Sequence, residues 1–178
     1  DPNYAVIDFE SPLLSLPYLF GTDINNIPNP NNYINAYERK ITYWNKFLDN
    51  KKFKIGINWK GSNDDKSFDL DCFKEISELP NIQLISLQKG NGEKDLEDIK
   101  FDIKSFNGSL DCDGSAFIDT AAVIMNCDLI ITCDTSIAHL SGALGKKTWI
   151  LLKKIPDWRW MLNRSDTPWY KNITLFRQ

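Results

Sequence analysis

One stretch, residues 126–152, constrains the fold of this chain more than any other, because its pattern changes from strand to helix and back. It opens with the apolar run 129–131, which is typical of a parallel strand covered on both faces. Residues 134–136 (Asp-Thr-Ser) favour a helix N-cap, and apolar positions then recur at helical spacing up to Gly145, which fits a C′ glycine. A second strand is expected at 148–152, so the stretch predicts a β-α-β unit.

The turn between the first strand and the helix of this unit is a candidate ligand site. In open α/β sheets, ligands bind at the carboxyl ends of the strands. A helix N-terminus there adds backbone N–H groups and about half a positive charge, which suit a phosphate. His139 follows Thr135 by one helical turn and so lies on the same face as the cap. The turn therefore predicts an anion site at Asp134, Thr135, Ser136 and His139.

The rest of the chain continues this alternation of strands and helices. Such an order with short loops predicts a parallel sheet with helices on both faces, which is a Rossmann-like α/β fold. The expected elements are a helix at 34–48, a strand at 53–59, a helix over 70–76 capped by Ser67 or Asp69, a strand at 82–87, a helix reaching 124 capped by Asp119 or Ser115, and a last strand at 173–176.

Two of these strands end in a glycine-containing turn with a lysine. Lys60 and Gly61 follow one strand, and Gln88 and Lys89 follow the next. Taken alone, either turn is explained as well by an ordinary β-to-α loop. Because the carboxyl ends of parallel strands meet at one edge of the sheet, we expect the ammonium groups of Lys60, Lys66 and Lys89 to converge on one cleft and bind a diphosphate.

Composition narrows the classes of function. With 178 residues, 42% of them hydrophobic and 25% charged, the chain is long enough for one domain with a sizeable core. A net charge of −3 gives no support to nucleic-acid binding, and no apolar run approaches the length of a membrane span. The four cysteines lack metal-ligand spacing and there is one histidine, so we expect no metal, no cofactor and a reduced, cytoplasmic setting.

Several well-known catalytic motifs are absent. No G-x-G-x-x-G follows a strand, and residues 142–147 lack the spacing and the Ser/Thr of a Walker loop. Asp134, Ser136 and His139 are triad residue types, but they crowd on one helical turn and cannot form triad geometry. What remains is an anion site in which N–H groups, lysines and hydroxyl groups replace a metal. Simple helix capping explains Asp134 and Thr135 equally well, and both roles can hold together.

Several motifs in one order give the chain a family resemblance. The run D-T-S-I-A-H-L-S-G-A-L-G-K at 134–146 resembles the donor-binding motif of heptosyltransferase-like glycosyltransferases of the two-domain GT-B architecture. It is closer still to the glycosyltransferase-like domain that follows tetratricopeptide repeats in many bacterial proteins. The resemblance covers residues 11–178. Further parts of the pattern are F-I-D-T-A-A-V-I at 117–124, P-D-W-R-W at 156–160, D-T-P-W-Y at 166–170 and L-F-R-Q at 175–178.

This resemblance implies the donor half of a metal-independent, inverting glycosyltransferase that takes a hexose or heptose from a nucleotide sugar. The catalytic base of such enzymes lies in an N-terminal acceptor domain. Residues 34–178 would then be the donor domain, and residues 1–33 the tail of a preceding acceptor domain or a strap packed on this one. The family places donor contacts at positions that correspond here to Asp134, Thr135 and His139, to the turn Trp59-Lys60-Gly61, and to Lys66, where an arginine is frequent.

Two other classes of function remain open. One is a module that binds a nucleotide or sugar phosphate without turnover, and the other is a scaffold domain that binds neither. The aromatic loop leaves a similar choice, because Trp158 and Trp160 suit stacking on a base or sugar as well as packing in a core or between domains. The partners that the resemblance implies are a nucleotide sugar, the acceptor domain and upstream tetratricopeptide repeats.

Overall fold

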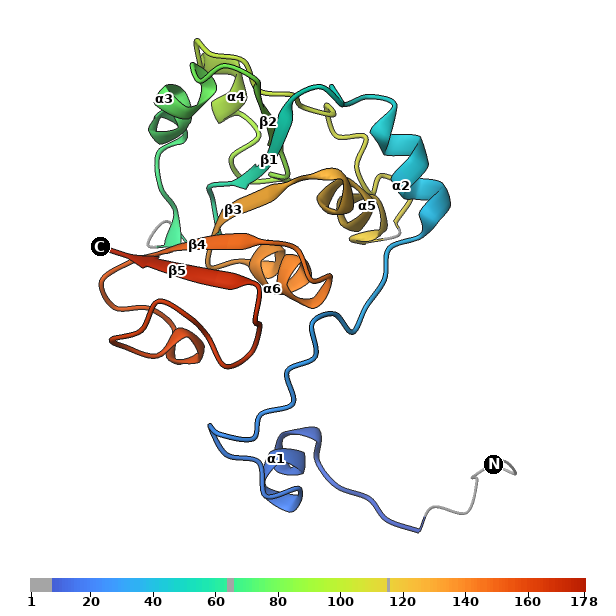
Figure 1. Ribbon diagram of the computed structural model, residues 1–178, viewed down its shortest axis with the longest axis vertical. Helices are drawn as coiled ribbons and strands as arrows, with labels where there is room; N and C mark the ends of the chain where they lie inside the picture. The colour runs from blue at the N-terminus through green and yellow to red at the C-terminus, as the bar shows by residue number, and fades with distance from the viewer. Residues whose placement is uncertain (1–7, 64–65, 115) are drawn as a thin grey trace.

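The computed structural model describes residues 8–63, 66–114 and 116–178. Within them, five parallel strands form one sheet in the order β2-β1-β3-β4-β5 (Figure 1). The strands are β1 (Phe53–Asn58), β2 (Ile82–Ser86), β3 (Leu129–Cys133), β4 (Thr148–Leu152) and β5 (Ile173–Arg177). The predicted Rossmann-like α/β fold with a parallel sheet is confirmed.

The strand order creates a switch in chain direction at the centre of the sheet. From β1 the chain moves outward to β2, and it then returns to the other side of β1 to form β3, with Ile57 beside Ile131. In doubly wound sheets such a switch point opens a crevice at the carboxyl ends of the two central strands. The fold therefore directs attention to the residues that follow Asn58 and Cys133.

Helices cover both faces of the sheet. On one face, α2 (Glu38–Asn45), α5 (Ile118–Asn126) and α6 (Ser136–Ala143) pack on Ile130 in a continuous apolar cluster. On the other face, Ile131 packs with Phe73, which belongs to the 3-10 turn Leu70–Phe73 ahead of α3 (Lys74–Ser77). Successive residues of β3 thus enter opposite layers, as the period of a strand requires.

The helix of the central β-α-β unit ends as its sequence predicts. Gly145 has a φ of +76°, and its N–H donates to the carbonyl of Gly142 at 3.0 Å. The next N–H, of Lys146, donates to the carbonyl of Ser141 at 3.0 Å. These two bonds form a Schellman motif, in which a glycine adopts the left-handed conformation without a Cβ penalty. The chain is turned directly into β4.

Other helix boundaries differ from the sequence prediction. The helix expected at 34–48 is shorter, because α2 begins only at Glu38, after the extended N-cap residue Tyr37, and ends at Asn45. The cap at Asp69 is confirmed, since its carboxylate accepts from the N–H of Asp71 at 3.0 Å. The cap at Asp119 is wrong, because Asp119 lies inside α5, and the alternative, Ser115, lies outside the described residues.

A remote side chain takes over the capping of α5. The carboxylate of Asp111 accepts from the N–H of Asp119 at 2.6 Å and from the hydroxyl of Thr120 at 2.6 Å. Asp119 is thereby left to bind Trp44 and Lys40 of α2, at 2.7 and 2.8 Å. A short α4 (Asp95–Asp98) lies in the long connection before this loop.

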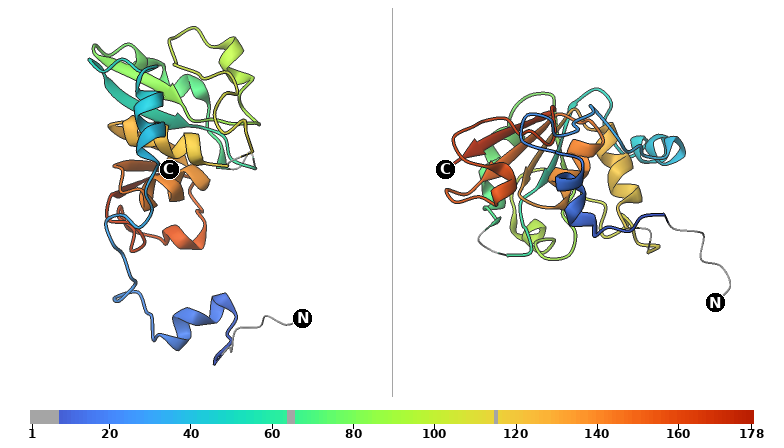
Figure 2. Two further views of the ribbon diagram at one scale, coloured as in Figure 1. Left: turned by 90° about the vertical axis from the view of Figure 1, so that its right-hand side faces the viewer. Right: turned by 90° about the horizontal axis from the view of Figure 1, so that it is seen from below.

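The N-terminal segment stands apart from the sheet (Figures 1 and 2). It contains a 3-10 turn at Leu13–Ser15 and the short helix α1 (Leu16–Leu19), and its Phe20 is 78% exposed. Contact with the domain is made further along, where Asn29 donates to the carbonyl of Pro168 at 2.8 Å. Residues 1–7 lie outside the described residues, and the division of the chain at residue 33 stays a prediction.

Candidate functional site

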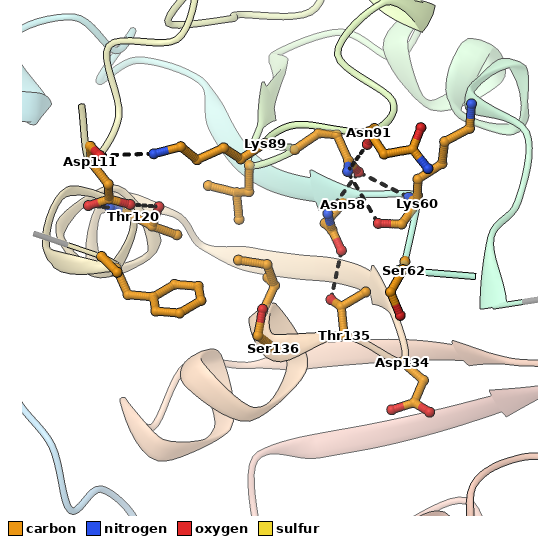
Figure 3. A pocket seen from close by; sticks show the side chains of 16 residues that line it. Asn58, Lys60, Ser62, Lys89, Asn91, Asp111, Thr120, Asp134, Thr135 and Ser136 are labelled. Atoms are coloured by element: carbon orange, nitrogen blue, oxygen red, sulfur yellow. Dashed lines mark hydrogen bonds between the residues drawn. The ribbon is translucent and has the colours of Figure 1, made fainter. Parts of the chain in front are cut away.

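A cavity of about 560 Å³ lies at the carboxyl ends of β1, β2 and β3 (Figure 3). This is the switch point of the sheet, where the first turn of α6 and the start of α5 also meet. Seven of the residues predicted to contact a donor line it, namely Lys60, Gly61, Gln88, Lys89, Asp134, Thr135 and Ser136. The other lining residues are Asn58, Ser62, Leu87, Asn91, Asp111, Ala116, Phe117, Thr120 and Ile137.

A buried amide, Asn58, joins the three strands at the cavity floor. Its Nδ2 donates to Oε1 of Gln88 at 2.8 Å, at the end of β2. Its Oδ1 accepts from the hydroxyl groups of Thr135 at 2.7 Å and Thr132 at 3.1 Å, at the end of β3. A buried polar group that loses its hydrogen-bond partner destabilises the folded state. The network therefore holds the ends of β1, β2 and β3 together.

Gln88 uses both ends of its amide to fix the turn after β1. Its Oε1 also accepts from the backbone N–H of Lys60 at 3.0 Å. Its Nε2 donates to the carbonyls of Asn91 at 2.6 Å and Lys60 at 3.2 Å. Both amide protons are thus used within the protein, and Gln88 shapes the cavity wall by holding its neighbours in place.

The start of α6 opens into this cavity without a side-chain cap. Thr135 occupies the N-cap position in an extended conformation, but its hydroxyl donates to Asn58 and makes no capping bond. Ser136 and Ile137, the first two residues of the helix, line the cavity. The backbone N–H groups of the first turn therefore have no acceptor from a capping side chain. Together with the positive end of the helix dipole, they can bind an anion.

The expectation that three lysine ammonium groups converge on this cavity is wrong. Lys60 forms an ion pair with Asp95 at 2.8 Å, and its side chain turns away from Thr135 (Figure 3). Lys89 donates to the carbonyls of Leu110 and Asp111 at 2.8 and 2.9 Å. These partners, at the start of α4 and in the loop before α5, are distant in sequence, so local spacing gave no sign of them.

Lys66, the third of these lysines, stands outside the lining of the cavity. Its ammonium group pairs with the carboxylate of Asp134 at 2.8 Å, directly before the N-cap of α6. Lys66 therefore neutralises a carboxylate that would otherwise repel an anion at this helix N-terminus.

Trp59 supports the turn from beneath and does not line the cavity. Its side chain is fully buried, and its Nε1 donates to Oδ2 of Asp95 at 2.8 Å. Burial alone would raise the pKa of Asp95, but the hydrogen bonds from Lys60 and Trp59 outweigh it and hold that pKa below its usual value. Gly61, in the same turn as Trp59, does line the cavity.

His139 is turned toward an aromatic cluster and away from the cavity lining. Its ring stacks on Trp160 with 5.2 Å between centroids, and its Nδ1 lies 3.0 Å from the hydroxyl of Tyr170. Burial lowers the pKa of His139, although the negative charge of Asp134 partly opposes this. The two tryptophans of the aromatic loop differ in their surroundings. Trp160 is fully buried and packs in the core, whereas Trp158 is 68% exposed.

Sequence reasoning missed several lining residues. Asn58 gave one signal, since it is a polar residue that directly follows the apolar run 55–57 at the carboxyl end of a strand. Thr120 and Asp111 gave none, because a helix position and an irregular loop meet only in the folded chain. Phe117 reads as one more apolar position in the sequence, yet its ring borders the cavity.

Two other classes of site have no counterpart among the described residues. No helix in this part of the chain has the length and apolar character needed to cross a membrane. Nor do three or more His, Cys, Asp or Glu side chains gather there in a way that could hold a metal ion.

Comparisons with known proteins agree with the geometry at the level of the fold. No family model and no curated protein matches the chain. A solved glycosyl transferase family 9 structure from Veillonella parvula does match, with a TM-score of 0.63, 13% identity and coverage of 82% of this chain and 42% of that one. E. coli ADP-heptose LPS heptosyltransferase II gives a TM-score of 0.62, 16% identity and coverage of 85% and 47%.

The chain shares its fold with glycosyltransferases. At these identities the likeness concerns the arrangement of strands and helices, which is the Rossmann-like α/β architecture described above. The chain matches less than half the length of either structure.

Proposed function

We propose that this chain is the donor-binding domain of a glycosyltransferase that uses a nucleoside-diphosphate sugar. The observation that carries the proposal is the position of the cavity, at the switch point of the sheet and in front of the uncapped start of α6. Ligands of doubly wound folds bind at such points, and helix N-termini favour phosphate groups. The fold shared with glycosyltransferase structures supports the same conclusion.

In this proposal the diphosphate binds at the first turn of α6, where Thr135 and Ser136 border the cavity. Asp134 and Lys66 form an ion pair without net charge beside the diphosphate, so the site without ligand holds no unpaired charge at this point. When the donor is bound, Lys66 interacts with the departing phosphate. Backbone N–H groups and Lys66 then stabilise the leaving diphosphate, and no metal is required. His139 lies one helical turn further on and packs α6 against the aromatic cluster.

Transfer itself is assigned to a two-domain enzyme. An inverting reaction needs an acceptor hydroxyl held in line and a base within hydrogen-bond reach of it. We place both in an N-terminal acceptor domain, with residues 1–33 as its tail or as a strap. Upstream tetratricopeptide repeats and a cytoplasmic location belong to the same proposal, which follows from the motif resemblance at 134–146.

A non-catalytic binding module is the second candidate. It is favoured by one observation, that the ammonium groups of Lys60, Lys66 and Lys89 are all engaged by groups of the protein itself. Such a module would bind a nucleoside diphosphate or sugar phosphate but would release no product from a nucleotide sugar, even when joined to the acceptor domain. A scaffold domain would bind neither.

Thermal-shift measurements with a panel of nucleoside diphosphates and nucleotide sugars test the proposal. A ligand at one hundred times its Kd stabilises the folded state by about 2.7 kcal/mol, which raises the Tm of a domain of this size by several degrees. We expect at least one nucleoside diphosphate to do so equally with and without EDTA. An unchanged Tm throughout the panel would leave the scaffold, and a shift abolished by EDTA would contradict metal independence.

A further inference from the structure

The cavity has two chemically different ends. Toward α6 and the β1 turn it is polar, with Ser136, Thr135 and Asn58. Toward the start of α5 its lining includes the apolar side chains of Leu87, Ala116, Phe117 and Ile137. A volume of about 560 Å³ is large enough for a whole nucleoside diphosphate, so both ends can be occupied by one ligand.

Phe117 is the aromatic residue at the apolar end, and its position is unfavourable for folding in two ways. Its side chain is 44% exposed, which forgoes much of the free energy that a buried phenylalanine contributes. Its backbone has a φ of 68°, a left-handed conformation that is uncommon for bulky residues and that glycine or asparagine would adopt more readily. An exposed aromatic ring held in such a conformation beside a cavity points to a role in binding.

The side-chain hydrogen-bond donors that the structure describes near this end, those of Lys89 and Thr120, are already used. The ammonium group of Lys89 donates to the carbonyls of Leu110 and Asp111. The hydroxyl of Thr120 donates to Oδ2 of Asp111 at 2.6 Å, and that carboxylate also receives the N–H of Asp119. Among the residues that the structure describes at this end, a ring entering here meets an aromatic face, and the side-chain donors of Lys89 and Thr120 already have partners.

We propose that the nucleotide base stacks on Phe117, and that this end of the cavity selects the base by ring area and not by the hydrogen-bonding pattern of its edge. The inference rests on the proposed function, because it assumes that a nucleotide enters the cavity with its diphosphate at α6. It adds that purine nucleotides bind more tightly than pyrimidine nucleotides, and that adenine and guanine are hardly distinguished.

The substitution Phe117→Asn separates binding from folding. Asparagine tolerates the left-handed backbone, so the variant should fold with an unchanged or raised Tm. It lacks an aromatic face, so its affinity for ADP in calorimetry should fall at least about tenfold, the change that corresponds to about 1.4 kcal/mol and lies within the usual range for a base on an aromatic ring. The affinity for inorganic pyrophosphate, which occupies only the polar end, should not change.

Two controls accompany this variant. Phe53→Asn removes a ring of similar exposure, 47%, at the amino end of β1, and it should leave the affinity for ADP unchanged. Phe117→Tyr keeps the aromatic face and should bind ADP like the unaltered chain. ADP bound equally well by Phe117→Asn would overturn the base placement alone. If the unaltered chain bound no nucleotide, both the proposed function and this inference would fall.

A base series on the unaltered chain tests the selection rule. ADP and GDP should bind with affinities within about threefold of each other, and UDP and CDP more weakly, because stacking grows with ring area. A preference of thirtyfold or more for ADP over GDP, or tighter binding of UDP than ADP, would show that the edge of the base is read and would overturn the rule.

Discussion

Asn58 and Gln88 determine the shape of the cavity floor through hydrogen bonds between neutral side chains. The amide of Asn58 donates to Gln88 and accepts from Thr135, so its two ends have different partners and cannot be exchanged. Charged groups have a smaller part, because Lys60 and Lys66 are paired with carboxylates. At the scale of the residue, the site is organised by groups whose hydrogen-bonding directions are fixed.

Asn58→Asp tests this arrangement with an isosteric change. The new oxygen would face Oε1 of Gln88 in place of the donating Nδ2, and it would bring a charge to a side chain that is only 4% exposed. We expect a loss of at least about 2 kcal/mol in the free energy of unfolding at pH 7. Because burial raises the pKa of the new carboxyl, part of the loss should be recovered as the pH falls toward 5.

Urea denaturation of both proteins at pH 7 and pH 5 provides the measurement. The matched control is Asn45→Asp at the end of α2, where the side chain is half-buried and outside the network. A loss at Asn58 no greater than at Asn45 would contradict the role of this amide.

His139 is the single histidine of the chain, so its titration can be followed without overlap. Its burial predicts a pKa below the usual value near 6.5. A histidine whose pKa is lower in the folded state resists protonation, so stability should decline as the pH falls from about 6.5 to the folded pKa and then level off. His139→Gln should remove this part of the pH dependence. The ring-proton NMR signal gives the pKa directly, and a value above 6.5 would contradict the account.

At the scale of the element, α6 is placed by a close approach to β5 and its preceding loop. A Cβ added at Gly142 would lie 2.6 Å from Cδ1 of Tyr170 and 2.9 Å from Cδ1 of Ile173. Glycine inside this helix therefore has a packing reason that outweighs its poor helix propensity. The same contact holds Tyr170 beside His139, so α6 and the loop before β5 are positioned together.

Gly142→Ala should destabilise the chain by about 1–3 kcal/mol, because the rigid ring of Tyr170 must move. The same change made in a Tyr170→Ala background should have the opposite sign, since the terminal methyl of Ile173 can then move into the space that the ring leaves, and alanine gains about 1 kcal/mol of helix propensity. Thermal denaturation of the four proteins completes the cycle. A stabilising effect of Gly142→Ala in the unaltered chain would contradict the packing argument.

The elements were predictable from sequence wherever periodicity and a stop signal coincided. The unit from β3 to β4 shows this best, because Gly145 ends α6 with the predicted geometry. The same local reasoning placed a cap at Asp119, where the capping carboxylate belongs to Asp111 in a loop without periodicity. It also placed lysines correctly at strand ends but could not see Asp95, which pairs with Lys60 across the fold. Local patterns determine elements, whereas partners depend on how loops meet.

At the scale of the whole molecule, the chain is a covered parallel sheet with one segment extending away from it (Figures 1 and 2). The sheet domain brings residues from four separate loops to one edge and closes them around a single cavity. The extending segment carries exposed apolar side chains, Leu14 and Phe20 among them. We therefore place the proposed donor binding in the sheet domain, since no residue of the described segment lines the cavity.

The most direct test of the central claim is a titration of the ¹⁵N-labelled chain with ADP, followed by the backbone amide signals. We predict saturable shifts at the start of α6, above all at Ser136 and Ile137, together with Gly61 and Phe117 on the cavity wall. The hollow between residues 24–29 and 164–171 should remain unaffected and serves as an internal control. The absence of shifts at Ser136 and Ile137, or shifts confined to that hollow, would contradict a nucleotide site at the switch point of the sheet.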